Sequence, residues 1–242
     1  MRVQMLNAGW ISSPAMVWRQ GEEPERRLRF PIPSYLIETD TERILIDTGL
    51  NPDAVRDVAA HYGPQASFME LEQEQSVAEQ VDPSTLTRIV LTHLHFDHAG
   101  GLALLPPEVP IVVQRREWEG GHDGETIRRN FFYPRDYELD GRRLDLIDGD
   151  HDLLGDGSIM LLLTPGHTPG HQSVRVGERL VLGADVAHFA ATLDDLRFPA
   201  FADDFDAQAR SAKQLRGMRD EGIVVLPGHD PDVLEPGPVE LG

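Results

Sequence analysis

The chain has 242 residues, no cysteine and a formal net charge of −19 at pH 7. Its length suits a single domain over residues 1–242, with a core that needs no disulfide. The absence of cysteine excludes disulfide scaffolds, cysteine zinc sites, iron–sulfur clusters and thiol nucleophiles. The acidic balance disfavours a nucleic-acid partner, because such a surface repels a phosphate backbone.

The first ten residues carry no unbroken apolar stretch and no small-residue cleavage site, so we read no signal peptide there. The sequence also has no run of about 18 apolar residues that would predict a membrane-spanning helix. We therefore expect a cytoplasmic protein without a membrane partner.

Short apolar runs bounded by turn residues predict strands that are buried on both faces. These runs are Ile44–Ile46, Ile89–Leu91, Ile111–Val113, Ile159–Leu163, Leu180–Leu182 and Ile223–Leu226. Helical patterns lie over Asn51–Tyr62, Glu70–Val81 and Phe205–Met218, and Asp203 and Asp204 are good cap candidates for the last of these. We interpret the acidic run Glu70–Glu79 as a solvated helix face. Buried strands flanked by helices predict an α/β layered architecture.

The segment from Gly120 to Arg143 is the longest break in the apolar pattern. It is polar, and we interpret it as an excursion over the surface and not as a domain boundary, because strand-like runs continue on both sides. It is long enough to form either a lid or a contact in a homodimer, and the sequence leaves both open.

Five of the apolar runs end in an aspartate or a histidine on a tight turn. These residues are Asp47, His93, His167, Asp185 and His229. Ligands of α/β sheets gather at the carboxyl ends of the strands. The pattern therefore brings imidazoles and carboxylates to one edge of a sheet, which indicates a metal site.

The densest cluster, His93–His98, holds three histidines and an aspartate within six positions, which is a strong motif. Imidazole and carboxylate ligands suit Zn²⁺, with Fe, Mn or Co as substitutes. The full set of candidate donors is His93, His95, Asp97, His98, His167, Asp185 and His229. Seven donors exceed one tetrahedral site and match two metals that share one carboxylate and one solvent oxygen.

With these motifs the chain resembles the metallo-β-lactamase-fold hydrolases, and the resemblance covers nearly the whole chain. The strings His93–Gly101 and His167–Ser173 look most like the N-acyl-homoserine lactonase branch. The resemblance implies a four-layer αβ/βα sandwich, an α/β fold that some schemes class as α+β. It also implies that His93, His95 and His167 hold the first metal, that Asp97, His98 and His229 hold the second, that Asp185 bridges them, and that Asp47 orients a ligand histidine.

The activity implied by the resemblance is the opening of a lactone ring, most plausibly of an N-acyl-homoserine lactone, which would make the chain a quorum-quenching enzyme. A hydroxide between the metals would attack the carbonyl, and Asp97 could carry its proton to the leaving alkoxide. Many lactonases of this branch place a tyrosine three residues after the bridging aspartate, where this chain has His188. His188 could donate to the substrate carbonyl in its place, or be a buried histidine with a structural hydrogen bond.

Several other functions stay open at this point. Another lactone or ester, such as a pyridoxolactone, would suit the same chemistry. A thioesterase of the glyoxalase II type is disfavoured, because it adds a helical C-terminal domain and only 13 residues follow His229. An iron oxygenase and a non-catalytic binding module are rivals of a different class, the second disfavoured because the ligand set is complete.

Apolar side chains could line a pocket for an acyl chain. The candidates are Met16, Val17, Trp18, Phe68, Phe96 and Phe132. Of the remaining histidines, we expect His171 to support a ligand or to lie in the core. We expect His61, His122 and His151 to be solvated, because they lie in polar stretches.

Overall fold

Two β-sheets pack face to face in a computed structural model, which describes residues 1–239. The last three residues of the predicted domain 1–242 therefore lie outside the described residues. The first sheet contains, in spatial order, β13 (Gly237–Pro238), β1 (Arg2–Pro14), β2 (Arg27–Glu38), β3 (Arg43–Ile46), β5 (Arg88–Val90), β6 (Ile111–Gln114) and β7 (Leu144–Ile147), and β4 (Glu70–Glu72) pairs with β1. The second sheet contains β12 (Val224–Pro227), β11 (Leu180–Ala184), β10 (Gln172–Val176), β9 (Ile159–Leu163) and β8 (His151–Asp152).

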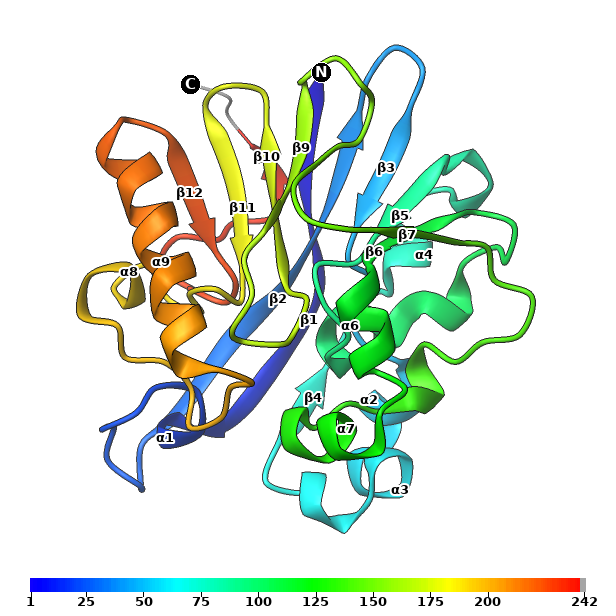
Figure 1. Ribbon diagram of the computed structural model, residues 1–242. Helices are drawn as coiled ribbons and strands as arrows, with labels where there is room; N and C mark the ends of the chain where they lie inside the picture. The colour runs from blue at the N-terminus through cyan, green and yellow to red at the C-terminus, as the bar shows by residue number, and fades with distance from the viewer. Residues whose placement is uncertain (240–242) are drawn as a thin grey trace.

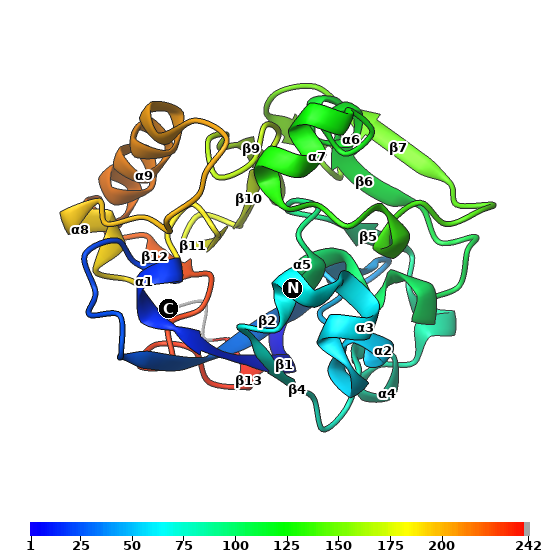
Figure 2. The same cartoon turned by 90° about the horizontal axis from the view of Figure 1, so that it is seen from below.

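Helices cover the outer faces of both sheets (Figure 1). The α-helices are α1 (Ala15–Trp18), α2 (Pro52–Arg56), α3 (Val58–Tyr62), α4 (Val77–Gln80), α5 (Phe96–Ala99), α6 (Arg115–Gly120), α7 (Gly124–Asn130), α8 (Thr192–Asp195) and α9 (Phe205–Asp220). The described residues also form short 3₁₀ helices, which are η1 (Pro64–Ala66), η2 (Pro83–Thr85), η3 (Gly100–Leu104) and η4 (Pro134–Asp136). Viewed from below, α5 lies between α8 and α9 on one side and α2 and α3 on the other (Figure 2).

The core is layered because successive strand residues point to opposite faces. In β3, Ile44 and Ile46 pack between the two sheets, whereas Leu45 packs under the helices of the first sheet. In β11, Leu182 packs between the sheets and Val181 packs under α9. Strands buried on both faces need apolar residues at every position. The predicted α/β fold, a four-layer αβ/βα sandwich, is confirmed.

The six predicted strands all form, as β3, β5, β6, β9, β11 and β12, and so does the predicted long helix, as α9. Asp204 caps α9, because its side chain accepts a hydrogen bond from the Ala207 N–H at 2.9 Å. The predicted helix over 51–62 forms as two helices, α2 and α3. Asp57 separates them with an extended backbone and caps α3 through the Ala60 N–H.

The predicted helix over Glu70–Val81 is wrong for most of its length. Glu70–Glu72 forms β4, which pairs antiparallel with β1, and only Val77–Gln80 is helical. The outward-facing acidic side chains of β4 form ion pairs with arginines of β2, Arg27–Glu70 and Arg29–Glu72, both at 3.0 Å. These two pairs reach across β1, which lies between β2 and β4, and they account for Glu70 and Glu72 of the acidic run.

Across residues 1–239, no helix combines the length and the apolar character that crossing a bilayer requires.

Candidate metal centre

The seven predicted donors meet at one end of the sandwich. His93 and His95 follow β5, Asp97 and His98 lie on α5, and the other three follow β9, β11 and β12. The arrows of β3, β11 and β12 point to this same lower end in Figure 1. All seven side chains are buried, with at most 4 % of any residue exposed. The carboxyl ends of strands from both sheets thus deliver ligands to one place.

The first set of donors is His93, His95, His167 and Asp185, whose ligand atoms lie within 4.8 Å of one another. His95 Nδ1 lies 3.0 Å from His93 Nε2 and 2.9 Å from His167 Nε2. Asp185 Oδ2 completes the set at 3.3 Å from His167 Nε2. Ligands of a tetrahedral zinc with bonds of about 2.0–2.1 Å lie about 3.3 Å apart, so these distances fit one cation.

The second set of donors is Asp97, His98 and His229, together with the other oxygen of Asp185. Asp185 Oδ1 lies 3.2 Å from His229 Nε2 and 3.5 Å from His98 Nε2. Asp97 Oδ2 lies 3.5 Å from His229 Nε2. One carboxylate, that of Asp185, therefore faces both sets, as a bridging ligand would.

Contacts on the far side of each ring fix which nitrogen of a ligand histidine faces the centre. The backbone carbonyls of Asn130 and Pro31 accept from His95 Nε2 at 2.7 Å and from His229 Nδ1 at 2.9 Å. Asp47 Oδ2 lies 2.7 Å from His98 Nδ1 and accepts from it. We assign the tautomers from these partners. In its neutral form, each of these rings turns an unprotonated nitrogen toward the centre.

Asp47 contacts His98, one of the predicted donors, as a partner that orients its ring would. It also accepts from the Thr92 hydroxyl at 2.7 Å, which leaves the Thr92 oxygen free to accept from His93 Nδ1 at 3.0 Å. One carboxylate thus orients His98 directly and His93 through Thr92. Partners of this kind orient metal-binding imidazoles in known sites.

Buried atoms without hydrogen-bond partners test whether a metal pair fits. Among the described residues, all four ligand atoms of the second set lack a hydrogen bond: Asp97 Oδ2, His98 Nε2, Asp185 Oδ1 and His229 Nε2. Buried polar atoms without partners are costly and rare in folded proteins. In the first set, the unprotonated nitrogens of His93 and His95 face each other at 3.0 Å. Both observations fit two cations.

The electrostatics of the centre point the same way. Burial opposes charge on His98, but the carboxylates of Asp185 and Asp47 outweigh it and raise the pKa of His98 well above its usual value. Burial would raise the pKa of Asp185, but the surrounding histidines, His188 first, hold it well below its usual value. The carboxylates of Asp185 and Asp47 thus attract positive charge to this centre, and bound cations supply it.

His188 lies beside this centre, with 1 % of the residue exposed. Its Nε2 is 3.2 Å from Asp185 Oδ2, and its ring packs at 5.7 Å from the ring of Trp18. Among residues 1–239, neither of its ring nitrogens has a hydrogen-bond partner. His188 is not among the residues that line the adjoining pocket, and its polar role toward a substrate stays a prediction.

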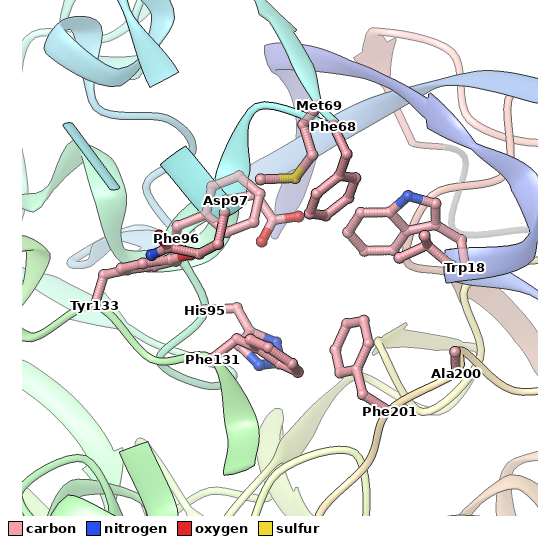
Figure 3. Close-up of a pocket in the computed structure, with 12 residues that line it drawn as sticks. Trp18, Phe68, Met69, His95, Phe96, Asp97, Phe131, Tyr133, Ala200 and Phe201 are labelled. Atoms are coloured by element: carbon pink, nitrogen blue, oxygen red, sulfur yellow. The ribbon is translucent and has the colours of Figure 1, made fainter. Parts of the chain in front are cut away.

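A pocket of about 300 Å³ adjoins the centre. Figure 3 shows Phe96 and Tyr133 on one side of it and Trp18 and Phe201 on the other, with His95 between them. The lining residues are Val17, Trp18, Gln65, Phe68, Met69, His95, Phe96, Asp97, Phe131, Tyr133, Ala200 and Phe201. Because His95 and Asp97 belong both to the pocket and to the donor sets, a molecule in the pocket reaches the metal centre.

Four of the six predicted pocket residues line the pocket, and two predictions are wrong. Met16 is exposed on α1 and points elsewhere, and Phe132 is buried in the core beneath the pocket. Phe131 lines the pocket in its place, with a left-handed backbone at φ 55° that turns its ring outward.

The segment Gly120–Arg143 forms part of the wall of the site. It contains α7 and η4, it supplies Phe131 and Tyr133 to the pocket, and its Asn130 carbonyl accepts from His95. The sequence predicted a surface excursion that could form a lid or a dimer contact. It did not predict the contact with His95, because that contact is made by a backbone group that any residue type could provide.

The remaining histidines differ from one another. His171 is fully buried and accepts from the Asp185 N–H at 3.1 Å, so it supports a ligand. His122 has an exposed side chain, and His151 is half-buried. The expectation that His61 is solvated is wrong, because its side chain is 11 % exposed and its Nε2 lies 3.4 Å from Asp136 Oδ1.

Glu117 on α6 is a site residue that sequence reasoning missed. It is fully buried, and its carboxylate accepts backbone N–H groups from both histidine-bearing segments of the first set. Glu117 is one of two glutamates in Arg115–Gly120, and among exposed charged neighbours nothing in the sequence distinguishes it.

Comparison with known proteins places these observations in a family. The model of the metallo-beta-lactamase superfamily matches residues 27–229. The N-acyl homoserine lactonase AttM of Agrobacterium fabrum is 27% identical over 96% of this chain and 94% of that protein. The N-acyl homoserine lactonase AiiA of Bacillus thuringiensis subsp. kurstaki is 30% identical over 86% of this chain and 84% of that protein.

Solved structures agree in fold. An N-acyl homoserine lactone hydrolase with the product N-hexanoyl-L-homoserine bound at its catalytic metal center has a TM-score of 0.83 at 27% identity, covering 96% of this chain and 94% of that chain. The dizinc quorum-quenching lactonase AidC has a TM-score of 0.71 at 19% identity, covering 98% of this chain and 92% of that chain, and it supports the fold alone.

Proposed function

Since the chain belongs to the metallo-beta-lactamase superfamily, we propose that this hydrolase opens the lactone ring of N-acyl homoserine lactones, and that one domain carries the whole site. The observation that carries the proposal is the junction of the two sets of donors with an apolar pocket through His95 and Asp97. Relatives that match almost the full chain are N-acyl homoserine lactonases, which supports the same substrate class.

Two zinc ions are the proposed cofactors, because imidazole and carboxylate donors suit zinc and tolerate Fe, Mn or Co. The first set would hold one ion, the second set the other, and Asp185 both. When bound, such a pair supplies Lewis acidity at a carbonyl oxygen and a water acidic enough to ionise near neutral pH.

The side chains of the chain itself supply proton transfer and orientation. Asp97 belongs both to the second set and to the lining of the pocket. Its carboxylate can therefore take a proton from the attacking water and deliver it to the ring oxygen as the ester bond breaks. His188 is the proposed hydrogen-bond donor to the carbonyl oxygen of the substrate. Its unpartnered nitrogens and its place beside Asp185 support this role.

The pocket supports an acyl chain as the second part of the substrate. Its volume lies at the small end of ligand pockets, which run from about 300 to about 1,000 Å³. Trp18, Phe96 and Phe201 present aromatic faces to it, and Met69 is a flexible neighbour. Burial of each methylene of a chain in such a lining contributes about 0.8 kcal/mol, so longer acyl chains should bind more tightly until the pocket is full.

A proton-release assay of the zinc-loaded protein tests the proposal. The panel contains butanoyl, hexanoyl, octanoyl and decanoyl homoserine lactones, γ-butyrolactone without an acyl chain, a thioester and a β-lactam. We expect turnover of the acyl homoserine lactones, with KM falling as the chain lengthens. Turnover of the thioester or the β-lactam without the lactones would overturn the substrate assignment.

A pair of phenylalanine variants tests the pocket. Phe201→Ala should raise KM for the decanoyl substrate several-fold more than for the butanoyl substrate, because Phe201 lines the pocket. Phe205→Ala is the matched control, since Phe205 is 42 % exposed at the start of α9 and is not a lining residue. Equal effects of Phe201→Ala on both substrates would show that the acyl chain binds elsewhere.

A further inference from the structure

Glu117 is a buried carboxylate that the proposed reaction does not use. It lies in the middle of α6, where its neighbours Arg116 and Glu119 are exposed, yet Glu117 itself has no solvent-accessible surface. A buried carboxylate is costly unless its oxygens accept hydrogen bonds. The hydrogen-bond partners of its two oxygens therefore indicate the role of Glu117.

Each oxygen of Glu117 accepts one backbone N–H, and the two donors belong to different segments. Oε1 accepts from Leu94 at 3.0 Å, and Leu94 stands between His93 and His95. Oε2 accepts from Gly170 at 2.7 Å, in the turn that begins at His167. The carboxylate thus joins the two segments that supply all three imidazoles of the first set.

The helix α6 lies in close contact with the turn that contains Gly170. A Cβ built on Gly170 would lie 2.4 Å from the Glu117 backbone nitrogen, so only glycine lets this turn come so near to α6. The segments are also joined beside His93, where the Gln172 N–H donates to the Thr92 carbonyl at 2.9 Å. Glu117 adds the link that lies between the two ligand histidines of the 93–95 segment.

The separation of these segments determines the geometry of the first set. Three imidazole nitrogens from two segments must converge to about 3 Å, as they do here. A shift of one segment by a fraction of an ångström changes the distances to His167 but not the distance between His93 and His95. A rigid link between the segments is therefore what a tetrahedral site needs.

We propose that Glu117 is a positioning residue of the first metal site, which holds the 93–95 and 167–170 segments at the separation that this site requires. The inference rests on the proposed pair of metals. It differs from a merely structural role, because removal of the link should weaken one metal site selectively.

The test measures zinc binding to wild type, Glu117→Gln and Glu119→Gln by competition with a chromophoric chelator. Glutamine keeps one acceptor oxygen and turns an NH₂ group toward the other N–H, so it breaks one of the two links. We expect the affinity of one site in Glu117→Gln to fall about ten- to a hundredfold while the other keeps its wild-type affinity. Glu119→Gln is the matched control on the same helix, because Glu119 is exposed.

The visible spectrum of the Co²⁺-substituted proteins is a second readout that does not depend on activity. The intensity of the bands reports coordination geometry, and it should change in Glu117→Gln but not in Glu119→Gln. Glu117→Asp, which keeps the charge but shortens the reach, replaces Glu117→Gln if that variant does not fold. Wild-type affinities at both sites with an unchanged spectrum would overturn the inference, even if the melting temperature fell. A wild type that binds no metal would instead refute the proposed function.

Discussion

At the scale of single residues, the centre depends on contacts that lie behind the ligands. The histidines that face the centre have little freedom, because His98 donates to Asp47, His229 to the Pro31 carbonyl and His95 to the Asn130 carbonyl. Such partners fix both the tautomer and the plane of each ring. The ligand atoms are therefore arranged before any cation arrives.

Asp185 is the residue on which both sets depend, since its two oxygens face different sets. Asp185→Ala should lower bound zinc below two per chain after dialysis, as measured by elemental analysis. Asp194→Ala is the control, because Asp194 is an exposed aspartate that pairs with Arg219. Two zinc ions retained by Asp185→Ala would contradict the bridging assignment.

Removal of the His188 side chain distinguishes a donor to the substrate carbonyl from a histidine with a structural role. If it donates to the substrate carbonyl, His188→Ala should lower kcat about 30- to 1,000-fold, equivalent to about 2–4 kcal/mol of transition-state stabilisation, with zinc content unchanged. His122→Ala, at an exposed histidine, should leave kcat at the wild-type value. Unchanged kcat in His188→Ala would remove the proposed role. Loss of zinc would show that His188 instead belongs to the metal centre, since its ligand atom lies within 4.8 Å of those of Asp185 and His229.

The kind of contact that a residue makes decides whether the sequence could predict its role. The metal donors could be identified because side-chain chemistry and spacing coincide in His93–His98 and recur after other strands. Asn130 could not, because only its backbone carbonyl contacts His95. Phe131 and Phe132 are identical side chains, and the backbone φ of Phe131 decides which one lines the pocket.

At the scale of elements, sequence reasoning succeeded where a strand is buried on both faces. β3 and β5 are continuous apolar runs and were predicted, whereas the longer β1 and β2 were missed. Pro31 and Pro33 argue against a strand in β2, since proline lacks the N–H of a sheet ladder. The structure accommodates them where the pairing with β1 shifts register, between Asn7 and Trp10.

The buried Glu117 on α6 predicts how the stability of the protein depends on pH. Burial raises the pKa of Glu117 from 4.5 to about 7. Between these two pH values, Glu117 holds a proton in the folded state but has released it in the unfolded state. The free energy of unfolding therefore falls as the pH rises from about 4.5 to about 7. Glu117→Gln carries no such proton. The stability of this variant relative to wild type should therefore increase from pH 5 to pH 8.

Urea denaturation at these two pH values measures the effect, with both proteins stripped of metal by a chelator so that metal binding adds no pH dependence. Glu119→Gln should follow wild type at both values, because Glu119 is exposed. An equal difference between wild type and Glu117→Gln at pH 5 and pH 8 would contradict the raised pKa.

At the scale of the whole molecule, the bound cations should stabilise the fold. Without them, buried carboxylates and histidines crowd together with unsatisfied atoms. A chelator should therefore lower the melting temperature by several degrees, and excess zinc should restore it. Calorimetry of the treated and restored protein measures this, and an unchanged melting temperature would count against the metal pair.

The ligands also divide evenly along the chain. In the proposed assignment, the first ion takes His93 and His95 from the part of the chain before β8, and His167 and Asp185 from the part after it. The second ion likewise takes two ligands from each part. The boundary between the two parts falls in the turn between β7 and β8, where the chain leaves one sheet for the other. The metal centre is thus a junction between half-chains, and in a protein nicked in that turn the ions would add to the apolar core between the sheets in holding the two halves together.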